Sequence, residues 1–107
     1  MFKFAEMFKD ALQMKNRVNK IQKGLKKLRV DAEVAGGMVK VTADGQQNIL
    51  KLEISSELIE KNDRRLLEDL VRSAVNEALN KSRAKAQEEM QKAFKDLPIS
   101  PEQLGLT

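Results

Sequence analysis

The chain of 107 residues contains neither cysteine nor histidine. Without cysteine, disulfides and thiolate chemistry are excluded, which fits a reducing compartment. Without histidine, the usual general base near neutral pH and the commonest transition-metal ligand are missing. The glycine stretches "AGGM" and "ADGQ" lack the lysine and the following helix of a phosphate-binding loop. We therefore expect no enzyme, no catalytic residue, no cofactor, no metal site and no small-molecule substrate.

Long hydrophobic runs and aromatic residues are also scarce. Tryptophan and tyrosine are absent and only four phenylalanines occur, so aliphatic side chains must supply most of the packing. The apolar runs fall far short of the roughly 20 residues that cross a bilayer. The opening "MFKFAEMFKDAL" is interrupted by charge and lacks the apolar block of a secretion signal. We expect one domain over residues 1–96 in the cytoplasm, followed by a partly mobile, proline-containing tail over residues 97–107.

Positive charge is concentrated at the start of the chain. The net charge is +4, but residues 1–29 carry nine basic and two acidic side chains, whereas residues 30–107 carry eleven basic and fourteen acidic ones. The segment "NRVNKIQKGLKKLRV" (16–30) holds six of these cations and no acid. Such an asymmetry predicts one face that meets an anionic partner.

The first 28 residues repeat with a period of seven. One set is Phe4, Ala11, Val18 and Leu25, and the other is Met7, Met14, Ile21 and Leu28. These two sets predict a long amphipathic helix with a heptad seam that favours a partner, and its positions from Val18 to Leu28 are expected to be buried. Gly24 lies off that seam and marks a tolerated weak point or a bend.

The period then changes from helical to alternating. Apolar residues occupy every second position in 30–34, 39–43 and 50–54, which predicts three short strands. The "DG" at residues 44–45 is typical of a type I′ hairpin turn, in which both central residues have positive φ. The three strands should form an antiparallel meander with one apolar face, and that face needs a cover.

A second long helix follows the strands. Residues 56–60 suggest a single helical turn, and Asn62 or Asp63 can cap a helix that continues towards Asp96. The two long helices would measure about 38 and 50 Å, against a radius of gyration of about 13 Å for a compact 100-residue domain. Three short strands cannot cover them, so we expect helical arms and an obligate or near-obligate homodimer.

The order of motifs from residue 36 onwards resembles the YbaB/EbfC family of bacterial nucleoid-associated proteins. The similarity is carried by "GGMVKVTADGQQNILKLEISSELIE" and "LLEDLVRSAVNEALNKS" and covers roughly residues 30–85. The first helix agrees with the family in pattern more than in residues. Relatives often begin with a Gly-rich stretch and a Met/Gln-rich first helix, whereas this chain departs from them with "MFKFAEMF" and a more basic helix. The resemblance implies an α+β fold of order α-β-β-β-α, with a three-stranded antiparallel meander flanked by two long helices. It also implies a tweezer-like homodimer that binds double-stranded DNA in the nucleoid with limited sequence preference.

The cations are the candidate DNA-binding residues, because lysine and arginine neutralise successive phosphates. We predict contacts from two clusters: Arg17, Lys20, Lys23, Lys26, Lys27 and Arg29 in the first helix, and Lys81, Arg83 and Lys85 in the second. A solvated helix face is the alternative for both clusters, and pairing with Glu77, Glu88 and Glu89 is a further alternative for the second. For Arg64 and Arg65, local pairing is the prediction. Asn16, Asn19 and Gln22 could read base edges.

Two other functions remain open from the residues alone. The exposed helical arms and the Met/Phe-rich start could grip a partner protein, which would make the chain a non-enzymatic interaction adaptor. A basic amphipathic helix could instead lie on an anionic membrane surface, although alternating lysines and small seam residues such as Ala11 disfavour this. With so few aromatic platforms, duplex DNA is favoured over single strands, and no membrane partner is expected.

Overall fold

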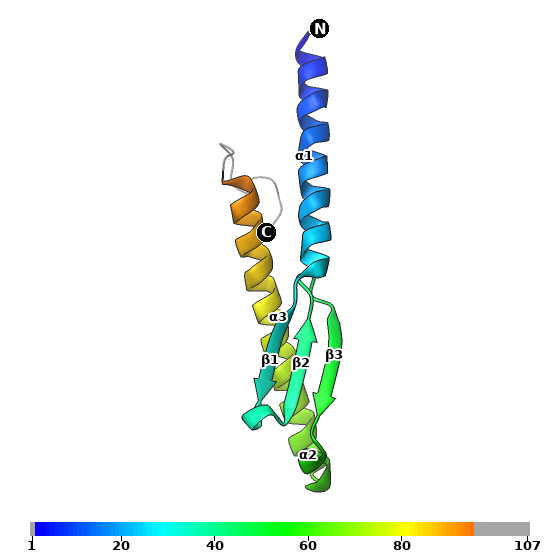
Figure 1. The fold of residues 1–107 in the computed structure, drawn as a ribbon, viewed down its shortest axis with the longest axis vertical. Coiled ribbons are helices and arrows are strands. Elements are labelled where there is room, and N and C mark those ends of the chain that lie inside the picture. The colour runs from blue at the N-terminus through cyan, green and yellow to red at the C-terminus, as the bar shows by residue number, and fades with distance from the viewer. Residues whose placement is uncertain (1, 96–107) are drawn as a thin grey trace.

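The computed structural model describes residues 2–95 and contains a single three-stranded sheet with a long helix on either side of it in the sequence (Figure 1). The elements in order are α1 (Phe2–Lys27), β1 (Val30–Val34), the 3-10 turn η1 (Ala35–Gly37), β2 (Val39–Ala43), β3 (Ile49–Ile54), α2 (Ser56–Glu60) and α3 (Arg64–Phe94). The predicted α+β fold of order α-β-β-β-α is confirmed. The tail predicted over residues 97–107 lies outside the described residues, and the division of the chain at residue 96 stays a prediction.

The sheet is an antiparallel meander of order β1-β2-β3, and α3 covers one of its faces. The alternation read from the sequence is correct, because Ala32, Val39, Val41 and Ala43 are buried while their neighbours Asp31 and Lys40 are exposed. Ala74 and Ala78 of α3 are fully buried in the same cluster. Their small side chains allow the helix to lie close to the sheet, where Leu58 of α2 closes one end of the core.

The cover of the sheet is incomplete along β3. Val41 pairs with Leu52 and Val39 pairs with Ile54, so these β3 side chains point to the same face as the core. Nevertheless, Leu50, Leu52 and Ile54 remain 48%, 45% and 36% exposed, because α3 packs mainly against β1 and β2. One chain by itself therefore leaves a row of large aliphatic side chains in water.

The molecule is elongated, with extents of 71 × 19 × 18 Å and a radius of gyration of 19.6 Å. Helix α1 runs away from the sheet and extends past the last turn of α3 (Figure 1). The expected projection of the helices is thus confirmed for the described residues. The seam expected to be buried from Val18 to Leu28 is only partly so, because Val18, Ile21 and Leu28 are half-buried. In the projecting part of α1, Phe4 is 80% and Met7 66% exposed. Only Leu25 of the seam is buried, because only the last turns of α1 reach the body.

The turn between β2 and β3 differs from the predicted type I′ turn. Neither Asp44 nor Gly45 has positive φ, whereas Gln47 does, with φ of 66°. The loop is longer than two residues, and the Asp44 carboxylate organises it by accepting hydrogen bonds from Gln46 N (2.8 Å), Asn48 N (3.0 Å) and Asn48 Nδ2 (3.0 Å). An aspartate side chain commonly stabilises a loop in this way, by accepting hydrogen bonds from backbone N–H groups that follow it. The dipeptide "DG" alone did not distinguish this loop from a two-residue turn.

Gly45 is needed for close approach rather than for its backbone angle. Its N–H donates a 2.8 Å hydrogen bond to the Leu25 carbonyl at the end of α1. A Cβ added at Gly45 would lie 2.7 Å from that oxygen, which is closer than real Cβ atoms come to such a group. Gly24, by contrast, has no atom of the described residues within 4 Å of an added Cβ.

The two glycines therefore predict opposite effects of substitution by alanine. We expect Gly45→Ala to destabilise the fold by about 1–3 kcal/mol, because the Leu25 backbone must move away from the loop. Gly24→Ala should stabilise it by up to about 1 kcal/mol through helix propensity. Urea unfolding of both variants at equal protein concentration measures this difference. A Gly45→Ala variant as stable as the unmodified chain would contradict the proposed packing of α1 on the loop.

The helix starts follow the sequence signals. Ser55 caps α2 by accepting a 3.2 Å hydrogen bond from Leu58 N, and Asp63 caps α3 by accepting a 3.1 Å bond from Leu66 N. Of the two capping candidates named above, the structure selects Asp63. Among the described residues, no helix is both long enough and apolar enough to span a bilayer.

Candidate nucleic-acid interface

Five cations on the C-terminal half of α1 form a continuous basic surface. The α1 cation surface consists of Arg17, Lys20, Lys23, Lys26 and Lys27, all of which are exposed. Within residues 2–95, none of the five lies in an ion pair. The acids of α1, Glu6 and Asp10, lie nearer its N-terminus. The basic half of this helix therefore keeps its full positive charge.

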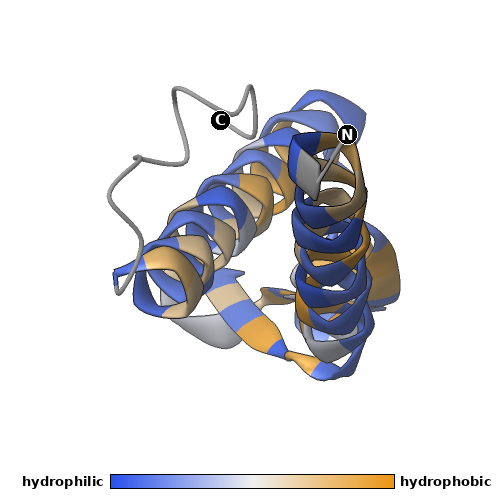
Figure 2. Cartoon of the chain, turned by 90° about the horizontal axis from the view of Figure 1, so that it is seen from above, coloured by the Kyte–Doolittle hydropathy of each residue, from blue (hydrophilic) through white to orange (hydrophobic). Residues whose placement is uncertain are grey.

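Helical geometry distributes these cations around α1. At about 100° per residue, Lys20, Lys23 and Lys27 lie on the side opposite Leu25, the residue that anchors α1 to the body. Arg17 and Lys20 line a groove between α1 and α3, and Lys23 and Lys26 border a depression beside Gln46. Figure 2, a view from above, shows the two long helices as separate columns with hydrophilic residues along both.

Arg29 has a structural role that the sequence did not suggest. Its Nη1 donates 2.9 Å hydrogen bonds to the carbonyl oxygens of Lys26 and Leu28. These bonds satisfy carbonyl groups at the C-terminus of α1, where a cation also interacts favourably with the helix dipole. The phosphate contact of Arg29 stays a prediction, but its guanidinium is already engaged.

The second predicted cluster, on α3, is largely paired. Lys81 Nζ lies 3.7 Å from Glu77 and donates a 2.9 Å bond to the Asp31 carbonyl, while Arg83 donates to Gln47 Oε1 and Asn80 Oδ1 at 3.3 and 2.7 Å. The pairing of Lys81 with Glu77, named above as an alternative to DNA contact, is present, and the DNA contacts of this cluster stay a prediction. The local pair at the start of α3 is likewise confirmed for Arg64, whose Nε lies 2.9 Å from Glu68. For Arg65 the pairing stays a prediction.

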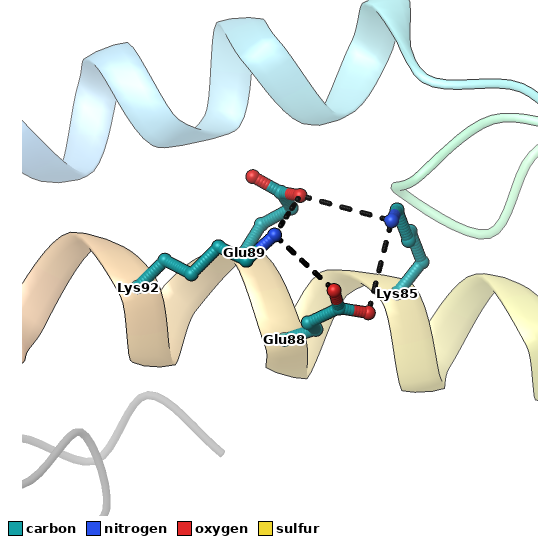
Figure 3. A network of polar contacts seen from close by, with 4 residues as sticks. All are labelled: Lys85, Glu88, Glu89 and Lys92. Carbon is teal, nitrogen blue, oxygen red and sulfur yellow. Dashed lines mark ion pairs between the residues drawn. The ribbon is translucent and has the colours of Figure 1, made fainter.

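Lys85 belongs to a four-residue ionic network further along α3 (Figure 3). Its Nζ lies 3.7 Å from Glu88 and 4.0 Å from Glu89, and Lys92 lies 3.2 and 3.7 Å from the same two acids. The hydrogen bond from Lys92 lowers the pKa of Glu88, so this carboxylate stays ionised and neutralises its partners at neutral pH. Such exposed pairs add little stability, but they cancel positive charge on α3.

Packing places a further cation beside the α1 cation surface. Lys92 of α3 lines the same groove as Arg17 and Lys20. Lys92 lies far from Arg17 and Lys20 in the sequence, so no local sequence pattern could have identified that they are neighbours. Arg83 also comes near α1, because it shares a depression with Gln22 and Leu25, whereas Lys81 lies beside the acids Asp31 and Glu77.

Comparison with known proteins decides the family. A model of the YbaB/EbfC DNA-binding family matches residues 1–97. This chain belongs to that family. A nucleoid-associated protein of Thermoanaerobacter sp. (strain X514) is 40% identical over 98 residues, which cover 92% of this chain and 88% of the relative. A nucleoid-associated protein of Chlorobium luteolum is 43% identical over 89 residues, covering 83% and 80% of the two chains.

A solved structure supports the fold of this YbaB/EbfC member. The crystal structure of the uncharacterized protein HP0035 from Helicobacter pylori superimposes with a TM-score of 0.75 and covers 88% of this chain and 96% of that one. The sequence identity is 22%, so the similarity concerns the fold alone. Within residues 2–95, no cluster of three or more acids is placed to hold a metal ion.

In this family member, a buried polar junction fixes the direction of α1. Ser82 of α3 is fully buried, and its Oγ donates a 2.7 Å hydrogen bond to the Asp44 carbonyl while accepting one of 3.1 Å from Gln47 N. Gln46 Nε2 donates to the Gln22 carbonyl of α1 at 3.1 Å. One loop is thus bonded to both long helices, and it holds the α1 cation surface at a set angle to the sheet.

The Asp44 carboxylate in this junction should make the stability of the fold depend on pH. Burial raises the pKa of the Asp44 carboxyl, but hydrogen bonds from the Asn48 side chain and the backbone N–H groups of Asn48 and Gln46 outweigh this effect and hold the pKa below its usual value. Its stabilising effect is therefore present above about pH 4 and is lost as the pH falls further. We expect the unmodified chain to exceed Asp44→Asn in stability by about 1–2 kcal/mol at pH 7, with a smaller gap at pH 3. Thermal unfolding of both proteins across this range measures the gap, and a constant gap would contradict the prediction.

Proposed function

We propose that this YbaB/EbfC member binds double-stranded DNA in the bacterial nucleoid as a homodimer. The contacts are mainly those of lysine and arginine with phosphates, so sequence preference is limited and the protein affects nucleoid organisation and gene expression. The observation that carries this proposal is the α1 cation surface, five exposed side chains without an acid nearby on their own helix. A solvated surface normally mixes charges of both signs, whereas this one is suited to a polyanion.

The spacing of the cations fits a duplex. From Arg17 to Lys27, α1 rises about 15 Å, and a duplex carries one phosphate charge per about 1.7 Å of its axis. More phosphates than cations are therefore within reach, and no precise register is needed. Because phosphate contacts carry no sequence information, base contacts from Asn16, Asn19 or Gln22 would be the source of any preference.

The homodimer is supported by the uncovered part of the sheet. β3 is an edge strand, so one row of its backbone groups has no partner strand among residues 2–95. Leu50, Leu52 and Ile54 lie exposed on the core face of that same strand. A second copy that packs against this face would bury them and would bring two α1 cation surfaces into one particle.

A salt titration tests the proposal. If three or four cations of each protomer neutralise phosphates, a dimer should show a logarithmic slope of affinity against salt near −6. Fluorescence anisotropy with a labelled duplex, from low to moderate salt, measures this slope, and sedimentation at the same concentrations reports the dimer. A chain that is monomeric and indifferent to duplex DNA at low salt would overturn the proposal.

One observation favours a second candidate, a protein-interaction adaptor. Phe4, Met7 and Phe8 near the free end of α1 are 80%, 66% and 68% exposed, an unusual cluster of large apolar side chains in water. A partner helix could lie along this stretch. The adaptor takes precedence if the duplex titration shows no binding while a variant with Phe4→Ser and Phe8→Ser loses association with a cellular protein.

A further inference from the structure

The groove between α1 and α3 has the form of a docking site. It encloses about 440 Å³, which is within the range of ordinary binding clefts. Ile21, Leu28 and Ala93 give it apolar walls, and Arg17, Lys20 and Lys92 place positive charge along its rim. Of the described residues that line it, Glu89 is the single acid, and it is already shared between Lys85 and Lys92 at 4.0 and 3.7 Å. The groove is therefore suited to a segment that is both apolar and acidic.

Gly24 adds room to this groove. It lines the groove in the middle of an exposed helix, where glycine is unfavourable compared with alanine. An added Cβ would meet nothing within 4 Å, so no contact among the described residues requires a glycine there. The position is explained if another segment lies against α1 at this point.

The chain itself supplies a segment of that chemistry. Residues 96–107, "DLPISPEQLGLT", contain Leu97, Ile99, Leu104 and Leu106 together with two acids, and they contain no lysine or arginine. They follow directly on α3, whose residue Ala93 lines the groove and whose Phe94 is 2% exposed and thus held in place. Twelve residues reach up to about 40 Å, well beyond the roughly 17 Å from Arg17 to Leu28 along α1.

We propose that residues 96–107 of each chain dock in the α1–α3 groove of the same chain and compete there with DNA. Leu97 or Ile99 and the later leucines occupy the apolar walls, while Asp96 and Glu102 lie beside the rim cations. Arg17 and Lys20 belong both to the groove and to the α1 cation surface, so the docked segment removes them from DNA contact. The competition rests on the proposed function, whereas the docking itself does not.

Docking is measured without DNA by paramagnetic broadening. Because the chain has no cysteine, a spin label on Ser100→Cys is unambiguous, and Ser56→Cys, exposed on α2, is the matched control. In ¹⁵N-labelled chains diluted into an excess of unlabelled, unmodified chains, the label at residue 100 should broaden the amide signals of residues 17–28 more than those of β3. Equal broadening of both regions would overturn the proposal. It would also be overturned if residues 17–28 broaden only when ¹⁵N-labelled, unmodified chains are mixed with spin-labelled chains, because the label then acts from a partner.

Competition is measured by truncation after Lys95. The shortened chain should bind a duplex on the order of fivefold more tightly at 0.1 M salt, because a tethered segment competes at millimolar effective concentration. The full chain carrying Asp96→Asn and Glu102→Gln should show part of this increase, and saturating DNA should restore the broadened signals. An unchanged affinity would refute the competition. Absence of DNA binding in every variant would instead refute the proposed function, leaving the broadening experiment to decide docking.

Discussion

Replacing Lys23, Lys26 and Lys27 with glutamine is expected to weaken duplex binding at least a hundredfold at 0.1 M salt. In a dimer this change removes six cations, and the logarithmic salt slope becomes shallower by about 0.9 for each phosphate that is no longer neutralised. The slope should therefore fall from near −6 towards −1. The three residues are exposed and unpaired among the described residues, so the fold and the dimer should be unaffected.

The matched control removes the same charge from the body of the protein. Lys40, Lys61 and Arg65 are also exposed and, among the described residues, lie in no ion pair, but they lie on β2, after α2 and at the start of α3. Their joint replacement by glutamine should lower the affinity only slightly, through the change in net charge. Equal losses of affinity in the two triple variants would show that binding depends on overall charge, and the α1 cation surface would have no special role.

Leu52→Glu is expected to abolish the dimer at micromolar concentration and, with it, tight DNA binding. Leu52 lies in the middle of the uncovered row on β3, at 45% exposure. In a single chain a glutamate there remains solvated, but in the dimer it would place an unpaired charge in an apolar interface. With only one α1 cation surface left per particle, the salt slope should fall to about half.

Leu12→Glu provides a closely matched control for that substitution. Leu12 is 46% exposed and lies off the heptad seam on α1, far from the sheet. We expect this variant to sediment as a dimer like the unmodified chain. If Leu52→Glu also sediments as a dimer, the β3 face is not the interface between copies. If both variants are monomeric, α1 contributes to that interface.

Local chemistry was sufficient to predict the elements of this fold. The alternation of Val39, Val41 and Ala43 identified β2 and its buried face, and the capping candidates Asn62 and Asp63 placed the start of α3 to within one residue. The heptad positions predicted α1 as a helix, but its seam is buried only at Leu25. Periodicity reports which side of a helix is apolar, and whether anything covers that side depends on residues distant in the sequence.

The features of the candidate interface also separate into those set by local sequence and those set by packing. The sequence by itself determined that residues 17–27 place five cations and no acid on one helix, because charge and helical period are local properties. The acids that pair with Lys81 and Lys85 are also local, since they lie three or four residues away on α3. Only the tertiary structure decided that Lys81 donates to the Asp31 carbonyl of β1 and that Lys92 joins Arg17 at one groove. It also decided that α3 leaves β3 uncovered. These outcomes depend on how helices pack across the sheet, and one-dimensional patterns do not record such packing.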